Sequence, residues 1–426
     1  MTRPNWEEQA IGDLFHIGAG KTMAAKAREG LQQRPFLRTS NVLWDEIDLS
    51  NVDEMAISDE ELRGKSLQAG DLLVCEGGDI GRAAVWAGQR EVMSFQNHLH
   101  RLRPKAEDTC SRFYVYFLQC GFTQLGIFEG AGNKTTIPNL SRNRLAALLV
   151  PVPPLNEQRA IAAVLSKVRE GIRCHVSAER IGIELKAASM NDLFTRGLRG
   201  EARKETEIGL MPESWAIEPI NAHHTVRSGG TPSRSNVAYW AGGSIPWVKT
   251  TEVNYCLIEK SEEHITPRGL DESAAKLLPA GTLLMAMYGQ GVTRGKVAIL
   301  GIEAACNQAC AAINPTDDTI EGKFLYHFLT WRYEAIRQLA HGGQQQNLNL
   351  DIVRALHVAA PGDDTEQQEI VAILDAIDRK IELHQQKRTV LEELFKALLH
   401  KLMTGEIDVN DLGLQALRTN DEGSTA

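Results

Sequence analysis

The amino-acid sequence repeats itself once, and this repetition constrains the fold more than any other feature. The segment PFLRTSNV at residues 35–42 is matched by PWVKTTEV at residues 246–253, which lie 211 positions later. Four further blocks match in the same order: 67–73 with 278–284, 96–97 with 307–308, 156–161 with 365–370, and 199–201 with 404–406. A unit of about 200 residues is too long for a solenoid repeat. The sequence therefore predicts two copies of one globular domain, each followed by a helix.

A heptad pattern of apolar residues ends each copy and predicts a long helix there. Thr365 with Gln368 predicts a capping box at the start of the second helix, and Gly405 marks its end. The first helix is expected to have Asn156 as its N-cap. The predicted interface between the helices consists of Ile161, Leu165, Val168, Ile172, Ile370, Leu374, Ile377, Ile381, Leu391 and Leu398.

The length of these helices predicts how they pack. A helix of about 40 residues that exposes a narrow apolar seam is unstable alone, so we expect an antiparallel coiled coil about a pseudo-two-fold axis. The alternative is that each helix packs on its own domain. The separation between the copies falls from 209 to 205 along the helices, and Ile183 and Leu185 lie out of phase with the seam. These two observations predict a shorter arm or a stutter in the first helix.

The globular halves are expected to be α+β, with mixed α/β elements. Short β-rich runs at residues 71–75, 83–86, 282–287 and 296–300 alternate with turns, and aromatic-rich residues 113–118 and 324–331 predict matching helices. The predicted organisation is a first globular domain at 1–154, a central helical region at 155–204, a second globular domain at 205–362, a C-terminal helical region at 363–410 and a flexible tail at 411–426.

Composition narrows the classes of function. No apolar run approaches the roughly 20 residues that span a bilayer, and the first residues show no secretory signal, so we expect a soluble, cytoplasmic protein. The 7 cysteines form no CxxC pair and no histidine has companions at ligand spacing, so neither disulfides nor a metal site is predicted. A net charge of −9 argues weakly against nucleic-acid binding. Because residues 155–204 carry 10 basic and 6 acidic side chains, any DNA surface must be local.

No motif in the sequence predicts a catalytic site. GAGKT at residues 18–22 resembles the end of a phosphate-binding loop, but Phe15 stands where that motif needs glycine. A Gly-rich S-adenosylmethionine loop and an Asn/Asp-Pro-Pro-aromatic tetrad are both absent, since Pro153 and Pro154 follow Val152. We therefore predict no cofactor and no enzymatic activity in this chain, which disfavours a stand-alone DNA methyltransferase. A coiled-coil adaptor that binds no DNA stays open as an alternative.

Polar loops at matching places in both copies are the candidates for a functional surface. Amide, hydroxyl and basic side chains read base edges and hold phosphates, although each loop could also be an ordinary polar turn. The loops are residues 38–40 with 249–251, 76–82 with 288–296, and 130–136 with 342–347. The candidate DNA-binding residues are Arg38, Thr39, Arg82, Asn97, Asn133, Lys134, Thr135, Lys249, Thr250, Arg294, Lys296, Gln344, Gln345 and Gln346.

From residue 1 to about 407, the sequence resembles the specificity subunit of Type I restriction–modification systems. The resemblance rests on the paired domain-plus-helix units and on four short motifs. These are PVPPLNEQ at 151–158, TEQQEI at 365–370, LMTGEI at 402–407 and the Asn-Gln pair at 307–308. The first copy departs from the pattern, with Gln-Asn at 96–97 and FTRGLRGE as the end of its helix.

The resemblance implies that DNA recognition, methylation and cleavage are carried out by different subunits. Each globular half would be a target-recognition domain that reads one half of a split double-stranded DNA site. The helices would space the two halves and dock two methylating subunits, which motor-nuclease subunits then join. S-adenosylmethionine, ATP and Mg²⁺ would bind those partner subunits, and no membrane is involved. Different residues at equivalent loop positions, such as Lys134 and Gln345, would read different half-sites.

Overall fold

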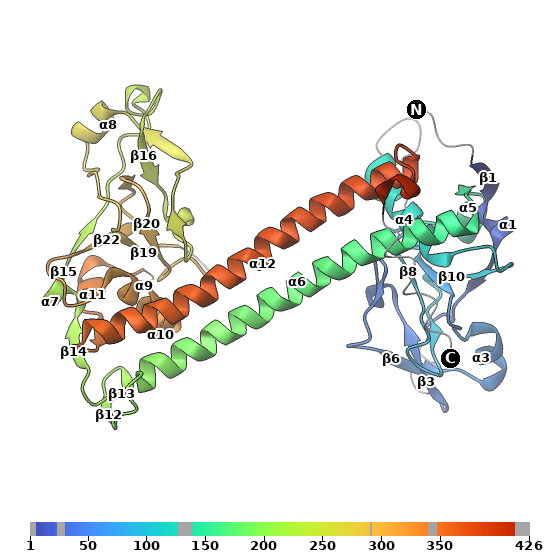
Figure 1. The fold of residues 1–426 in the computed structure, drawn as a ribbon, viewed down its shortest axis with the longest axis horizontal. Coiled ribbons are helices and arrows are strands. Elements are labelled where there is room, and N and C mark those ends of the chain that lie inside the picture. The colour runs from blue at the N-terminus through green and yellow to red at the C-terminus, as the bar shows by residue number, and fades with distance from the viewer. Residues whose placement is uncertain (1–5, 24–29, 127–138, 290–291, 340–346, 414–426) are drawn as a thin grey trace. The chain divides into compact units, whose positions relative to one another are not determined.

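The computed structural model describes residues 6–23, 30–126, 139–289, 292–339 and 347–413. The chain divides into two compact units, the first formed by Met1–Val176 with Gln386–Ala426 and the second by Ser177–Gln385. Both divisions fall inside the long helices, α6 (Leu155–Arg196) and α12 (Asp364–Thr404). Each unit thus combines one globular domain with part of each long helix (Figure 1). Within these described ranges, no helix is long and apolar enough to cross a bilayer.

The globular domain of the first unit is built on two small sheets and an aromatic helix. The larger, antiparallel sheet has the order β2-β10-β7-β8, the smaller has the order β6-β3-β9, and β1 pairs with β11. Phe113 and Leu118 of α4 pack on Leu72 and Val74 of the larger sheet. The strands and helices are β1 (Glu7–Ala10), α1 (Ile11–Leu14), β2 (Phe15–Ala19), β3 (Gln33–Leu37), β4 (Val42–Leu43), β5 (Glu46–Ile47), β6 (Asp53–Ala56), α3 (Asp59–Lys65), β7 (Leu72–Cys75), β8 (Ala83–Val85), β9 (Ser94–Phe95), β10 (Leu99–Pro104), α4 (Ser111–Cys120), α5 (Arg142–Ala146) and β11 (Leu149–Val152).

The second unit repeats this plan with one more strand in its main sheet. The main sheet has the order β15-β22-β19-β20-β17, the smaller sheet has the order β18-β16-β21, and two further pairs are β14-β23 and β12-β13. Phe324 and Phe328 of α9 pack on Met285 and Val297 of the main sheet. The elements are β12 (Arg203–Thr206), β13 (Gly209–Pro212), β14 (Ala216–Pro219), α7 (Ile220–His223), β15 (His224–Ser228), β16 (Ile245–Val248), β17 (Leu257–Ile258), β18 (Glu263–Ile265), α8 (Pro267–Asp271), β19 (Leu283–Ala286), β20 (Val297–Leu300), β21 (Ala305–Cys306), β22 (Cys310–Pro315), α9 (Gly322–Trp331), α10 (Tyr333–Leu339), α11 (Leu350–Arg354) and β23 (His357–Ala360).

The duplication and the mixed α/β class are therefore confirmed. The runs expected at 71–75, 83–86, 282–287 and 296–300 are strands β7, β8, β19 and β20, and the two aromatic segments are α4 and α9. A further equivalence lies outside the matched blocks. The Trp6 ring packs edge-on against Phe113 at 6.2 Å, and the Trp215 ring does the same against Phe324 at 5.9 Å.

The two long helices run antiparallel to each other within each unit. In the first unit, the Arg169 guanidinium lies 4.5 Å from the centre of the Phe395 ring. In the second, Lys186 Nζ lies 2.6 Å from Asp378 Oδ2, and Gln385 Nε2 lies 2.9 Å from Glu179 Oε1. The residue numbers of each pair add to 564, so one register describes the pairing in both units.

The predicted interface residues lie on the inner faces of these helices. Ile161, Leu165, Ile370 and Leu374 are buried, and Val168, Ile172, Ile377, Ile381, Leu391 and Leu398 are half-buried. The ends of the helices also pack on the globular domains. Ile161 and Leu165 share a core with α4, and Ile370 and Leu374 share one with α9. The alternative that each helix packs on its own domain is thus realised only in the first turns of each helix, since the last turns pack on the other domain, as Phe194 and Phe395 do.

The expected stutter in the first helix is wrong. The seam continues without a break through Glu179, Gly182 and Lys186, whereas Ile183 and Leu185 are each 53% exposed. Polar and small residues occupy the seam there, so the apolar stripe of this helix segment does not mark the interface. The arms are also equal, since α6 has 42 residues and α12 has 41. Each helix is followed by a glycine with positive φ, Gly197 after α6 and Gly405 after α12. These two glycines are the equivalent helix ends, so the match of residues 199–201 with residues 404–406 is wrong.

Both predicted helix starts are also displaced. Helix α6 begins at Leu155, where the amides of Glu157 and Gln158 donate to the Pro154 carbonyl, so Asn156 lies inside the helix. Helix α12 begins at Asp364, and the Asp363 carboxylate accepts a hydrogen bond of 2.9 Å from the Thr365 amide. Asp363 therefore caps this helix in place of the box predicted at Thr365 and Gln368. The side chain of Asp363 or of Thr365 can accept a hydrogen bond from a free amide of the first helical turn, so the sequence pattern does not tell which of them is the cap.

Candidate nucleic-acid interface

Two of the predicted loop segments, 38–40 and 76–82, contact each other in the first unit, and the chain that follows a third is anchored beside them. The turn at residues 76–82 joins β7 to β8, and its Glu76 carbonyl accepts a hydrogen bond of 2.9 Å from the Leu140 amide. Leu140 follows the loop at 130–136 and is fixed again by His100, whose Nε2 lies 2.7 Å from the Leu140 carbonyl. The Arg82 guanidinium donates to the Thr39 carbonyl at 3.0 Å. The fold thus gathers segments that are far apart in the sequence.

The second unit repeats the backbone contact that anchors the last of these segments. The turn at residues 288–296 joins β19 to β20, and the Met287 carbonyl before it accepts a hydrogen bond of 3.0 Å from the Leu348 amide. Leu348 follows the loop at 342–347. The Thr250 hydroxyl donates to Asn307 Oδ1 at 2.9 Å, and Lys296 Nζ lies 2.6 Å from Asn254 Oδ1. The two units therefore share the backbone hydrogen bond made by Leu140 and by Leu348, while the side-chain contacts around it differ.

The candidate residues differ in how accessible they are. Arg38 pairs with Asp53 at 3.0 Å and Lys249 pairs with Glu262 at 2.6 Å, and both basic side chains are about one-third exposed. Arg82 pairs with Asp79 at 2.6 Å. Thr250 and Arg294 are buried, so within this fold they support the loops, and Thr39, Asn97 and Lys296 lie between these extremes. The remaining candidates, Asn133, Lys134, Thr135, Gln344, Gln345 and Gln346, lie outside the described residues.

The GAGKT segment has a packing role. A Cβ on Gly20 would lie 2.1 Å from the Phe95 carbonyl oxygen, so only glycine fits there. Lys21 Nζ lies 2.6 Å from Glu61 Oε2, and this hydrogen bond lowers the pKa of Glu61. Gly229 meets the Cys306 carbonyl in the same way at 2.2 Å. The shared close approach accounts for glycine at both places, and a match of residues 18–22 with residues 227–231 would have predicted it.

A buried glutamine joins each long helix to the aromatic helix beside it. Gln158 Oε1 accepts a hydrogen bond of 2.9 Å from the Cys110 amide, and its Nε2 donates to the Pro153 and Asp108 carbonyls at 2.8 and 3.3 Å. Gln367 makes the same three contacts, at 2.9 Å with the Glu321 amide and at 3.1 and 2.7 Å with the Pro361 and Thr319 carbonyls. This bonding explains the glutamine of PVPPLNEQ and TEQQEI.

About two turns further along, the same joint is built differently in the two units. In the first unit the Tyr116 hydroxyl lies 3.0 Å from Ser166 Oγ and donates to Asp45 Oδ2 at 2.6 Å. At the equivalent positions of the second unit, His327 Nε2 lies 3.0 Å from Asp375 Oδ1, and Lys323 Nζ lies 2.6 Å from Asp375 Oδ2. The hydrogen bond from His327, together with Lys323, lowers the pKa of Asp375 to about 2. The ionised carboxylate therefore ties α9 to α12.

His327, Asp375 and Asp378 also bring their ligand atoms within 4.8 Å of one another, as the donors of a metal site would. Ammonium groups occupy both carboxylates, since Lys323 lies 2.6 Å from Asp375 and Lys186 lies 2.6 Å from Asp378. The two positive charges offset the two negative ones. The cluster is thus accounted for as an ion-pair network that holds α6, α9 and α12 together.

The segment after α6 closes onto the start of α12. The Leu198 amide donates a hydrogen bond of 2.6 Å to Glu366 Oε1, and Arg199 pairs with Glu369 at 2.8 Å. A Cβ on Gly197 would lie 2.9 Å from Glu366 Oε1, so glycine makes room for this carboxylate. The glutamate of TEQQEI and the glycine that ends α6 therefore form one structural feature.

The sequence and the fold are both similar to those of known proteins. A family model described as the Type I restriction modification DNA specificity domain matches residues 4–184 and 212–393. The putative type I restriction enzyme MjaX specificity subunit of Methanocaldococcus jannaschii is 22% identical over 95% of this chain and 94% of its own. The EcoR124I/EcoR124II specificity subunit of Escherichia coli is 28% identical over 39% of this chain and 44% of its own. A solved specificity subunit from M. genitalium has a TM-score of 0.61 at 16% identity, covering 93% of this chain and 96% of its own.

The chain belongs to the Type I restriction–modification specificity family, because the family model covers most of both copies. It is the DNA specificity subunit of such a system, a non-catalytic component with two target-recognition domains. The fold likeness to the M. genitalium subunit agrees with this assignment.

Proposed function

We propose that each target-recognition domain reads one half of a split DNA site through the loop segments gathered on it. The observation that carries this proposal is the shared anchoring of unlike loops. Leu140 and Leu348 hold equivalent loops to equivalent strand ends, while the loop sequences GAGNKTT and GGQQQN differ. Two domains of the same fold that carry different loop side chains suit an asymmetric DNA site. Each half of the site then faces its own set of hydrogen-bond donors and acceptors.

The accessible basic side chains would hold phosphates and thereby set the position of the loops on the duplex. Arg38 and Lys249 are the best placed, since both are partly exposed and both pair with carboxylates on the surface. Such exposed ion pairs are weak, so a phosphate could replace the carboxylate at little cost. Amides and hydroxyls of residues 133–135 and 344–346 would supply base contacts. The overall charge of −9 is compatible with a local DNA surface of this kind.

The paired helices would set the distance between the half-sites and dock two methylating subunits. Several apolar side chains on their outer faces support a docking role, because exposed apolar surface commonly marks protein interfaces. They are Val176, Val390 and Leu394 in the first unit, and Ile181, Ile183, Leu185, Ile373 and Leu383 in the second. Methyl transfer with S-adenosylmethionine would belong to those subunits, and ATP-driven cleavage with Mg²⁺ to motor-nuclease subunits.

A domain exchange tests the proposal. Residues 1–150 are replaced by the equivalent domain of another specificity subunit, and methylated sites are mapped by sequencing DNA from cells that also express the methylating subunit. One half of the methylated site should change and the other should stay. A change in both halves would contradict independent reading. Binding of no DNA by the assembled complex would favour a coiled-coil adaptor.

A further inference from the structure

A basic groove lies in the first unit, between α6 and the start of α4. Its volume is about 720 Å³. Small residues of α6, Ala162, Ala163 and Ser166, line it and are buried or half-buried. The exposed side chains around them are mostly basic: Arg112, Arg159, Lys167 and Arg173, with Glu170 as the acidic one. The α6 residues that line the groove follow one face of the helix for 14 positions, or roughly 20 Å.

The positive charge of this groove is only partly balanced. Lys167 pairs with Glu170 at 2.7 Å and Arg173 with Glu46 at 3.7 Å, but all four side chains are about half exposed or more, so these pairs are weak. Arg112 is held by Asp45 at 3.1 Å. For Arg159 the structure records neither a hydrogen bond nor an ion pair with any described residue. Arg159 and Lys167 are therefore available to a ligand of opposite charge.

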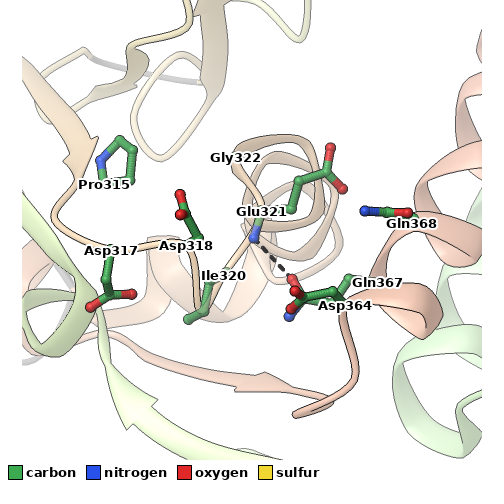
Figure 2. A pocket seen from close by; sticks show the side chains of 9 residues that line it. All are labelled: Pro315, Asp317, Asp318, Ile320, Glu321, Gly322, Asp364, Gln367 and Gln368. Atoms are coloured by element: carbon green, nitrogen blue, oxygen red, sulfur yellow. Dashed lines mark hydrogen bonds between the residues drawn. The ribbon is translucent and has the colours of Figure 1, made fainter.

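The equivalent place in the second unit is more acidic. A smaller pocket of about 280 Å³ lies there, and Gln368 lines it at the position that corresponds to Arg159. Figure 2 shows Asp318, Glu321 and Asp364 around this pocket, with Glu321 hydrogen-bonded through its amide to Gln367. Asp317 is a fourth carboxylate in the lining. Ala376 and Glu382 stand where the first unit has Lys167 and Arg173, whereas Lys323 and Arg379 stand where it has Arg112 and Glu170.

We propose that the groove of the first unit docks an acidic segment of a partner protein, and that the second unit lacks this contact. The inference rests on the proposed function, under which the partner is the methylating subunit. Small residues along one helix face allow close approach of another chain, and the basic side chains around them select carboxylates. Charge of this kind sets partner choice and association rate.

A protein segment fits this groove better than DNA does. Gly70 and Val85, which line it, lie at one end of the β7–β8 hairpin. The turn at residues 76–82, which belongs to the proposed DNA surface, lies at the other end. The groove is thus directed away from the loops that would read DNA.

The charge difference has a consequence for assembly. The duplication offers two equivalent docking places, but only one carries the basic groove. Two identical methylating subunits are then held unequally, and the copy on the first unit binds more tightly at low salt. Because screening weakens exposed charge pairs, raising the ionic strength should reduce this difference.

The test uses the full-length chain with the methylating subunit of its system. The variant R159E/K167E reverses the groove charge, and Q368E/A376E introduces the same residues at the equivalent exposed positions of the second unit. Native mass spectrometry counts the bound copies, and titration at low and high salt gives their affinities. The groove variant should lose at least about tenfold in affinity for one copy at low salt. The control variant should keep the affinities of the wild type, and circular dichroism should show that both variants are folded.

Several outcomes would overturn the proposal. Equal affinities in the wild type and both variants would show that the groove does not dock the partner. Equal losses in both variants would remove the asymmetry. Unchanged binding of methylating subunits with weaker DNA binding of the R159E/K167E complex would make the groove a phosphate site. If the wild-type chain binds no methylating subunit, the proposed function fails and the inference falls with it.

Discussion

Gly182 lies directly against Ile381 where α6 and α12 pass each other in the second unit. A Cβ built on Gly182 would be 2.7 Å from Ile381 Cγ1, which is closer than two non-bonded carbon atoms approach. The glycine therefore lets the two helices keep one register at a point where α6 contributes no large apolar residue and α12 contributes Ile381. Gly171 occupies a similar place in the first unit, but its nearest neighbour, at 3.2 Å, is the flexible end of Leu391.

The two glycines should respond differently to alanine. Gly182→Ala should lower the free energy of unfolding by about 1–3 kcal/mol, because overpacking forces Ile381 to move. Gly171→Ala should stay within about 1 kcal/mol of the wild type, since Leu391 can rotate away and alanine favours the helix. Thermal or urea denaturation of the full chain measures both. A Gly182 variant as stable as the Gly171 variant would contradict the packing described.

The buried glutamine of the second unit should be far more sensitive than its exposed neighbour. Gln367→Ala removes the partner of the Glu321 amide and of two carbonyls, which leaves buried polar groups without hydrogen bonds. A loss of about 1–3 kcal/mol in the free energy of unfolding is expected. Gln368→Ala, one residue further on, is the control and should cost little because that side chain is exposed. Equal losses would mean that Gln367 does not join the helix to the domain.

The Asp375 ion pair should make stability depend on pH in the acidic range. Its pKa is lowered to about 2 in the folded chain, against an ordinary value of 3.8. The unfolded chain therefore takes up the proton first as the pH falls, so the stabilisation is present above about pH 4 and is lost toward pH 2. The difference in unfolding free energy between wild type and Asp375→Asn should shrink as the pH falls from 5 to 3. A difference that does not change with pH would contradict an ionised Asp375.

The loops should carry DNA specificity. Lys134→Ala and Gln345→Ala should each weaken specific binding of the assembled complex, by about 1–3 kcal/mol where the side chain makes a bidentate base contact and by less where it touches phosphate. Binding isotherms with specific and scrambled duplexes separate the two cases, because a phosphate contact weakens both equally. Unchanged affinity in both variants would make these loops ordinary turns.

Much of the fold follows from periodic signals in the sequence. Strands β7 and β19 and helices α4 and α9 were predictable because their residues repeat in both copies with the expected β or aromatic character. The course of the seam through Gly182 and Lys186 was not predictable from hydrophobicity, since its contacts there are a glycine and an ion pair. Pairs such as Gln158 with Cys110 join residues that only the fold brings together. The bases that the two domains would read stay a prediction from residues 133–135 and 344–346, because amide, hydroxyl and ammonium groups suit several bases.

The central claim is that the paired helices act as a ruler between the two readers. The register offers a way to lengthen them, because the divisions after Val176 and after Gln385 lie within two residues of each other in that register. Four helix-forming residues inserted at both places keep every contact within each unit. An α-helix rises 1.5 Å per residue, so the arms grow by roughly 6 Å.

Mapping of methylated sites for this double insertion tests the claim most directly. DNA rises about 3.4 Å per base pair, so the unread spacer should lengthen by about one to two base pairs while the bases read at each end stay the same. Two residues inserted at each place should instead rotate the seam by roughly half a turn and abolish assembly. An active enzyme with four added residues in each helix and an unchanged spacer would contradict the ruler.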